Sequence, residues 1–174
     1  MKDITKKFII FLTLFFINLN LNADVPYYVD FKYILNQSTA GKKAQNFLKN
    51  KLEQGLKKLS EQEKNILKEE KQLIQQKKLI KPDEYKGKVD SLRSKVLKLQ
   101  KERDNLLKSV SKQRLTARNE LLKNLNPIIS EYMQEKKIRM VVDKKSILLA
   151  DQNLDITKQI IELLNKKLKS IKLN

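Results

Sequence analysis

The chain has 174 residues and a formal net charge of +18, from 38 Lys and Arg against 20 Asp and Glu. It has no Cys and no His, which excludes disulfides, thiolate nucleophiles, zinc sites with Cys or His ligands and the usual general base near neutral pH. With only 3 Gly and 3 Pro, the composition favours long helices over a loop-rich enzyme. We therefore expect no enzymatic activity, no catalytic residues and no cofactor.

Residues 1–23 have the layout of a secretory signal peptide. Three lysines precede the apolar run 8–17, and Ala23 is a small residue suited to cleavage. An uncleaved membrane anchor is the alternative, but a span needs roughly 20 apolar residues and this run is about half that. We expect an exported, soluble protein. Such a basic chain would meet anionic membrane surfaces, lipopolysaccharide or acidic protein segments, and no nucleic acid.

Residues 27–35 alternate in polarity and predict a half-buried strand, with Val29 and Phe31 on one face. The stretch NQSTAGKKA follows, at residues 36–44. It predicts the start of a long helix, with Ser38 or Thr39 as the N-cap.

The Gly41-Lys42 pair in that stretch also raises the possibility of a phosphate-binding loop. Such a loop requires GxxxxGK[ST], because backbone amides surround the phosphates and a hydroxyl holds magnesium. Asn36 stands where the first glycine is needed and Lys43 where the hydroxyl is needed. The sequence therefore argues against nucleotide binding.

Residues 39–126 are almost unbroken helical sequence and carry one apolar residue every seven positions. After Pro82 a second pattern begins, with apolar steps of four and three. Because proline opens a helix but breaks one from within, we expect a long antiparallel hairpin with its tip near residues 80–83. The predicted seam between its helices is narrow and consists of Leu52, Leu59, Ile66, Leu73, Val89, Leu92, Val96, Leu99 and Leu106.

Five apolar residues of the hairpin fall off this seam and are expected to be at least partly exposed on a charged rod. Scattered exposed leucines are ordinary on protein surfaces. On a long basic arm, however, they favour a weakly adhesive binding surface. These candidate contact residues are Leu56, Leu67, Ile74, Leu97 and Leu107.

The C-terminal part predicts two short strands, at residues 138–143 and 147–150, and a terminal helix with Asp155 as its N-cap. Asp143, Asp151 and Asp155 could make a hard-cation site, but their spacing matches no calcium loop, so turn and cap roles are expected. Residues 24–38 and 127–174 would form a small body with strand edges that need a partner. Self-association is expected there, through Val29, Phe31, Val141, Val142, Leu148 and Leu149.

Two segments of the sequence resemble the Skp (OmpH) family, periplasmic chaperones for outer-membrane proteins in Gram-negative bacteria. YYVDFKYILNQSTAGKKAQNFL is similar to the family's opening strand and its "A-G-K-x-A-Q" motif, and MVVDKKSILLADQNLDITKQIIELLN to its "V-V-D…A-D…L-D-I-T…L-N" ending. The hairpin lies between them, as in the family. Leu149 departs from the pattern, because many members carry an aromatic residue there.

The resemblance implies a mostly helical α+β fold that assembles as a homotrimer, with a shared β body and three coiled-coil hairpin tentacles around a cavity. It also implies an ATP-independent holdase in the periplasm that shields unfolded outer-membrane proteins from aggregation. Two alternatives stay open: a periplasmic coiled-coil adaptor or spacer, and a protein that binds lipopolysaccharide or another anionic membrane surface.

Overall fold

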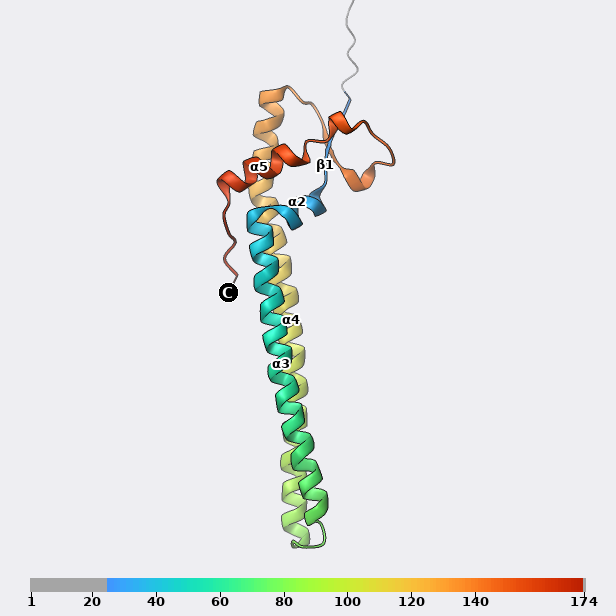
Figure 1. Cartoon of the computed structure of the whole chain (residues 1–174), viewed down its shortest axis with the longest axis vertical. Coiled ribbons are helices and arrows are strands. Elements are labelled where there is room, and N and C mark those ends of the chain that lie inside the picture. The colour runs from blue at the N-terminus through green and yellow to red at the C-terminus, as the bar shows by residue number, and fades with distance from the viewer. Residues whose placement is uncertain (1–24, 174) are drawn as a thin grey trace, which may run out of the picture.

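A computed structural model describes residues 25–173 and shows a long two-helix arm joined at one end to a small body (Figure 1). The mostly helical α+β fold expected from the sequence is confirmed. The predicted signal peptide, residues 1–23, lies outside the described residues. In chain order the elements are β1 (Tyr27–Val29), α2 (Phe31–Gln37), α3 (Thr39–Gln76), α4 (Pro82–Lys136), β2 (Val141–Asp143), the 3-10 turns η1 (Lys144–Ser146) and η2 (Gln152–Leu154), and α5 (Thr157–Lys167).

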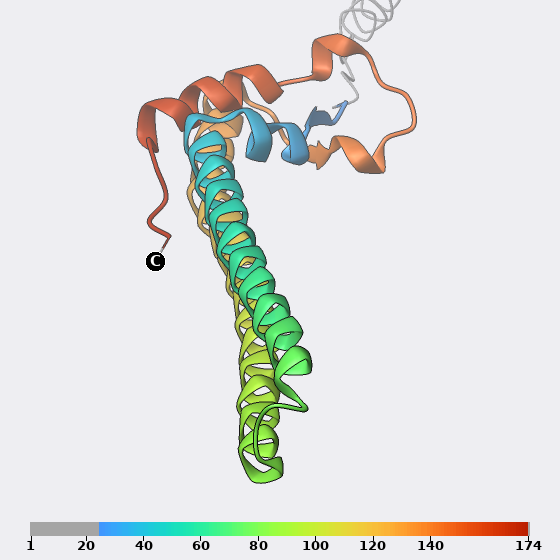
Figure 2. The same cartoon turned by 60° about the horizontal axis from the view of Figure 1, so that its bottom comes forward.

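Helices α3 and α4 lie side by side along the whole arm and run antiparallel (Figures 1 and 2). Their connection spans residues 77–81, and Pro82 occupies the first turn of α4, where its missing N–H has no intrahelical partner to lose. The tip was predicted near residues 80–83, which overlaps the end of this connection. With 38 residues, α3 alone is about 57 Å long at 1.5 Å per residue.

Helix α4 is longer than the sequence analysis suggested, because it passes Asn126 and continues to Lys136. Pro127 lies inside it and removes one backbone donor. The neighbouring residues Leu125 and Ile128 are almost completely buried in the core, and this packing outweighs the local cost of the proline. The helix ends at Lys137, whose φ of 56° places it in the left-handed region.

The strand predicted over residues 27–35 is wrong beyond Val29, because Phe31–Gln37 forms helix α2. Asp30 explains the change of direction: its side-chain Oδ1 accepts a hydrogen bond of 2.7 Å from the Tyr33 backbone N–H. This is an N-cap, which alternation of polar and apolar residues does not reveal. Phe31 consequently lies on a helix, partly buried against the core.

The sheet contains two short parallel strands. Tyr27, Tyr28 and Val29 of β1 stand opposite Val141, Val142 and Asp143 of β2. The second predicted C-terminal strand, residues 147–150, does not form in the described chain. Its central residues, Leu148 and Leu149, are instead 98% and 90% exposed. An extended segment needs a neighbouring strand for its backbone groups, and the single chain offers none there.

The core lies where α2, α4, α5 and β1 meet, and α5 crosses the upper part of α4 (Figures 1 and 2). Asp155 lies one residue before the N-cap position of α5, although its Oδ1 still accepts 2.9 Å from the Thr157 backbone N–H. The predicted capping residue is thus displaced by one position. The buried cluster comprises Val29, Ile34, Ala40, Leu121, Leu125, Ile128, Ile156, Ile160 and Leu164.

The junction between α2 and α3 is tightly packed around Ser38 and Gly41. Ser38 is fully buried and its Oγ caps α3 by accepting 3.2 Å from the Gly41 N–H, as predicted. A Cβ on Gly41 would lie 2.0 Å from the Leu35 carbonyl oxygen, so the two backbones approach more closely than any other residue permits.

Replacing Gly41 by alanine is therefore expected to destabilise the protein by about 2–3 kcal/mol, since α2 must move to make room. Gly87 is the matched control. It lies in α4, and a methyl group added there would meet nothing within 4 Å, so Gly87→Ala should stabilise by about 0.5–1 kcal/mol. Urea unfolding followed by circular dichroism measures both. Equal effects at the two glycines would contradict the close-packed junction.

Candidate functional site

The seam of the arm is narrow, as predicted, and eight of its nine predicted residues are at least partly buried. Val96 is the exception, because 48% of it is exposed. At this level of the arm Glu69 of α3 reaches Lys95, the residue before Val96, so a polar contact stands where an apolar one was expected. The buried or partly buried residues of the predicted seam are Leu52, Leu59, Ile66, Leu73, Val89, Leu92, Leu99 and Leu106.

A second row of α3, one residue every seven, faces α4 with polar side chains. Gln62 Nε2 donates a hydrogen bond of 3.1 Å to Glu102 Oε2. Seven residues further toward the tip, Glu69 forms an ion pair with Lys95 of α4. Beyond it, Lys88 Nζ donates 3.3 Å to Gln76 Oε1. These contacts align the helices in one register but bury little apolar surface.

The layer around Gln62 is incompletely packed. A cavity of about 220 Å³ opens there between the helices, lined by residues that include Gln62, Ile66, Leu99 and Glu102. Gln62 Oε1 is buried and has no hydrogen-bond partner in the described part of the chain. A buried acceptor without a partner costs roughly 1–3 kcal/mol. The middle of the arm is therefore held together weakly.

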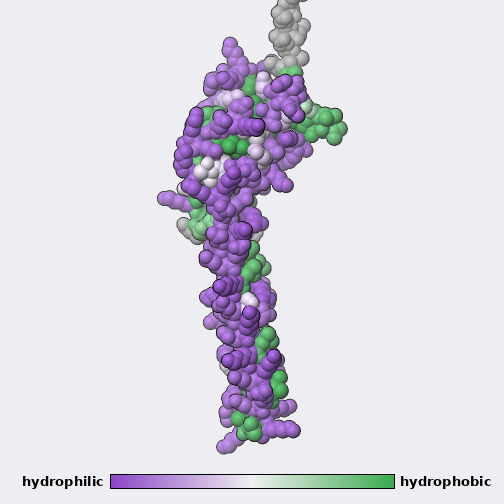
Figure 3. Space-filling model, viewed as in Figure 1, coloured by the Kyte–Doolittle hydropathy of each residue, from purple (hydrophilic) through white to green (hydrophobic). Residues whose placement is uncertain are grey.

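All five off-seam residues predicted to be exposed are exposed, and green apolar patches follow the edge of the arm in Figure 3. The exposed fractions of Leu67, Ile74 and Leu97 are 50%, 61% and 72%. Leu56 and Leu107 are 44% and 49% exposed. The patches are separated by charged side chains, so the arm presents many small apolar contacts instead of one large face.

Sequence reasoning missed further exposed apolar side chains on the arm. Leu79 at the tip is 82% exposed, and Leu115 near the body is 56% exposed. Phe47 of α3 is 44% exposed, with the Lys51 ammonium 6.0 Å from its ring centroid. None of these residues lies on the predicted apolar row. That departure was the signal in the sequence that could have identified them.

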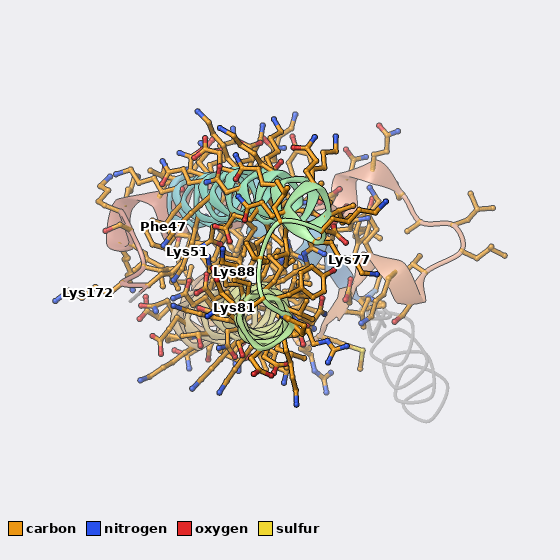
Figure 4. All side chains as sticks on the ribbon, turned by 90° about the horizontal axis from the view of Figure 1, so that it is seen from below. Phe47, Lys51, Lys77, Lys81, Lys88 and Lys172 are labelled. Carbon is orange, nitrogen blue, oxygen red and sulfur yellow. The ribbon has the colours of Figure 1, made fainter. Side chains whose placement is uncertain are left out.

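Positive charge surrounds the arm on all sides. In the view from the tip, many side-chain nitrogens point outward from both helices (Figure 4). The ion pairs between α3 and α4, such as Arg103 with Glu63 at 3.2 Å, have both partners well exposed and contribute little to stability. At the C-terminal end of α4, a hydrogen bond to Glu135 raises the pKa of Lys136.

Three of the first four backbone amides of α3 form hydrogen bonds within the protein. Thr39 N–H donates a hydrogen bond of 2.7 Å to Asn165 Oδ1 of α5. Lys42 N–H donates one of 2.9 Å to the Ser38 carbonyl oxygen. Gly41 N–H is bonded to Ser38 Oγ and is buried. Because phosphate binding at a helix start needs free amides, this stretch is a structural junction and not a phosphate site.

The three C-terminal aspartates have the turn and cap roles expected from the sequence. Asp143 Oδ1 accepts a hydrogen bond of 3.2 Å from Lys145 N–H. Asp151 Oδ1 accepts one of 2.9 Å from Asn153 N–H. Asp155 binds Thr157 as described above. Within residues 25–173 the structure has no group of three or more Asp, Glu, His or Cys placed to hold a metal ion.

Four of the six residues predicted for the association surface lie together. Val29, Phe31, Val141 and Val142 line a hollow of about 410 Å³ beside β2, between the sheet and α4. The other two, Leu148 and Leu149, lie apart from it on the loop after η1 and are almost fully exposed. The body thus presents two separate apolar features.

Comparison with known proteins gives one family and one fold. A family model described as outer membrane protein (OmpH-like) matches residues 27–164. The crystal structure of a candidate outer membrane chaperone (OmpH-like) from Caulobacter crescentus CB15 superposes with a TM-score of 0.79 at 22% identity, over 86% of this chain and 90% of that one. At this identity the likeness establishes the fold. The comparison with curated proteins gives no match. Among residues 25–173, no helix has the length and apolar content needed to cross a membrane.

Replacing the polar layer at Gln62 with apolar residues should stabilise the arm. In Gln62→Leu/Glu102→Leu the unpaired carbonyl disappears and the polar groups between the helices become apolar, so we expect the free energy of unfolding to rise by about 1–2 kcal/mol. Urea unfolding is the measurement.

The exposed pair between the same helices supplies the matched control. Glu69→Gln/Lys95→Gln should change stability by less than about 1 kcal/mol. A loss of stability in the leucine variant would show that the layer is well packed.

Proposed function

Because the chain belongs to the OmpH-like family of outer membrane proteins, we propose that it is a periplasmic chaperone, an ATP-independent holdase for unfolded outer-membrane proteins. In this proposal the arms of several copies surround a client chain and keep it from aggregating before it inserts into the membrane. The client is the substrate, and no reaction is catalysed.

The observation that carries the proposal is the surface of the arm, where exposed apolar side chains are dispersed among positive charges. A folded partner would need a continuous complementary face. Dispersed contacts such as Leu67, Ile74 and Leu97 suit a partner without fixed structure, because each binds weakly and can exchange. Many weak contacts hold an unfolded chain without imposing one conformation on it.

Charge would supply the long-range attraction. The chain carries a formal net charge of +18, and acidic unfolded chains would be drawn toward it faster than neutral ones. The mechanism requires no nucleotide. In agreement with this, the backbone amides at the start of α3 are bonded to Ser38 and Asn165.

The body is proposed to assemble the chain into a homotrimer. The β2 strand has only three residues, and the hollow beside it exposes apolar side chains. Leu148 and Leu149 are also exposed, in a segment whose sequence favours a strand. A strand from another copy would satisfy the open edge and cover both features.

Export to the periplasm is part of the proposal and rests on residues 1–23. A charged start, a short apolar run and Ala23 indicate cleavage by a signal peptidase. Residues 24–38 and 127–174 would then be the trimerisation body and residues 39–126 the arm.

The alternative best supported by an observation is binding to lipopolysaccharide or another anionic membrane surface, favoured by the excess of lysine on the arm. Such binding should fall steeply with salt and need no unfolded client. The adaptor alternative is weaker, because polar contacts such as Gln62 with Glu102 interrupt the continuous apolar seam that a rigid spacer would favour.

We expect a triple variant of the arm to lose much of the holdase activity while the seam between its helices stays intact. The variant is Leu67→Ser/Ile74→Ser/Leu97→Ser. Each substitution removes an exposed apolar contact. The measurement is light scattering of a urea-denatured β-barrel protein diluted into buffer. Wild-type protein at threefold trimer excess should suppress the scattering, and the triple variant should require several-fold more protein.

The matched control replaces three exposed uncharged residues of the arm, Gln54, Gln75 and Asn105, by serine. This variant should protect the client as well as the wild type does. If the wild-type protein gives no protection at all, the holdase proposal fails.

The trimer is tested by Leu148→Asp/Leu149→Asp. Equilibrium sedimentation at micromolar concentration should give a trimer for the wild type and smaller species for the variant, because charges would be buried in the interface. Leu97→Asp on the arm is the control and should stay trimeric. A monomeric wild type would contradict the assembly.

A further inference from the structure

An open groove of about 1130 Å³ runs along the arm where it joins the body. We name it the root groove. It is bounded by the end of α2, by residues 41–52 of α3 and by residues 108–121 of α4. It lies close to the body, whereas Leu67, Ile74 and Leu97 lie on the half of the arm nearer the tip.

The floor of the root groove is apolar and arises from small residues. Ala44 and Ala117 are buried at its base, where their short side chains leave a depression between the longer neighbours on the two helices. Leu48 and Leu121 are also buried there. Leu115 is 56% exposed at the side, so an apolar side chain is available to an incoming ligand.

The rim of the root groove is positive. Five basic residues line it and no acidic residue does: Lys49, Lys108, Lys112, Arg114 and Arg118. Lys49 has a distant partner in Glu53 at 3.8 Å. The other four are exposed and form no ion pair with the part of the chain that the structure describes. Such a rim favours carboxylates or other anions on the ligand.

Amide side chains add a third kind of group to the groove. Gln45 Nε2 donates a hydrogen bond of 2.6 Å to Asn36 Oδ1, and Asn46 also lines the groove. Amides both donate and accept hydrogen bonds, as a peptide backbone does. An acyl chain offers no hydrogen-bonding groups along its length. The combination therefore fits a polypeptide better than a lipid tail.

We propose that the root groove is a docking site for an extended, unfolded polypeptide segment in which apolar side chains alternate with carboxylates. The proposal deepens the holdase function and rests on it. Apolar side chains would lie on the alanine floor beside Leu115, and carboxylates would contact Arg114 and Arg118. The arm thereby has one charge-selective site near the body in addition to the dispersed contacts nearer the tip.

The test uses a fluorescent, disordered synthetic peptide in which leucine alternates with aspartate, and measures its binding to the purified protein by fluorescence anisotropy. Leu115→Ser/Arg114→Glu/Arg118→Glu should weaken binding about tenfold or more. The matched control, Val96→Ser/Lys68→Glu/Lys71→Glu, makes the same kinds of change nearer the tip, at an exposed valine and two lysines, and should weaken it less than about threefold. Circular dichroism and sedimentation verify that both variants fold and assemble as the wild type does.

Two further probes separate the possible ligands. A peptide with lysine in place of aspartate should bind the wild type at least tenfold more weakly. Vesicles of phosphatidylglycerol should bind the groove variant and the control variant equally. The groove proposal fails if the groove variant and the control variant lose the same amount of affinity for the acidic peptide. It also fails if the groove variant loses vesicle binding while its peptide binding is unchanged.

The same proteins distinguish this proposal from the holdase function. If the wild type prevents aggregation of the β-barrel protein but the groove variant binds the acidic peptide normally, the groove proposal fails and the holdase proposal stands. If the wild type does not prevent aggregation, but it binds the acidic peptide and the groove variant does not, the holdase proposal fails and the groove proposal stands.

Discussion

The arm is held together by a single apolar row on α3, and its surface follows from that constraint. One residue every seven gives a seam too narrow to cover the remaining apolar side chains of either helix. Those side chains are therefore exposed, and polar residues such as Gln62 and Glu69 take the places of a second apolar row. The helices gain much of their stability from helix propensity and local side-chain pairs. The seam thus produces an arm that is marginally packed and that exposes many apolar side chains.

An arm of this kind needs an anchor, and α4 provides it. The helix extends from the tip into the body, where Leu121, Leu125 and Ile128 belong to the same buried cluster as Ile160 and Leu164 of α5. The body therefore orders the root of the arm even though the middle contains an unpaired carbonyl. Because the body supplies this order, the surface of the arm can vary without unfolding the chain.

Periodicity in the sequence was sufficient to predict the hairpin, its tip and the exposure of its off-seam leucines, because a long helix repeats the same environment many times. It was insufficient in the body, where elements are short and tertiary contacts decide. Alternation over residues 27–35 predicted a strand, but the Asp30 cap begins a helix instead. The helical arm was predicted to end at residue 126, but α4 continues through Pro127, with Leu125 and Ile128 buried on either side. The root groove was not predicted, since it depends on where alanines of two distant segments meet.

The close approach of Gly41 to the Leu35 carbonyl also fixes a direction in space. An arm of about 57 Å acts as a lever, so a rotation of roughly 5° at this contact would displace the tip by about 5 Å. If the chain assembles as proposed, a rigid contact at the root would set how far apart the tips of neighbouring arms lie. In the proposed trimer, the glycine in NQSTAGKKA would thus influence the spacing of the arm tips from the opposite end of the molecule.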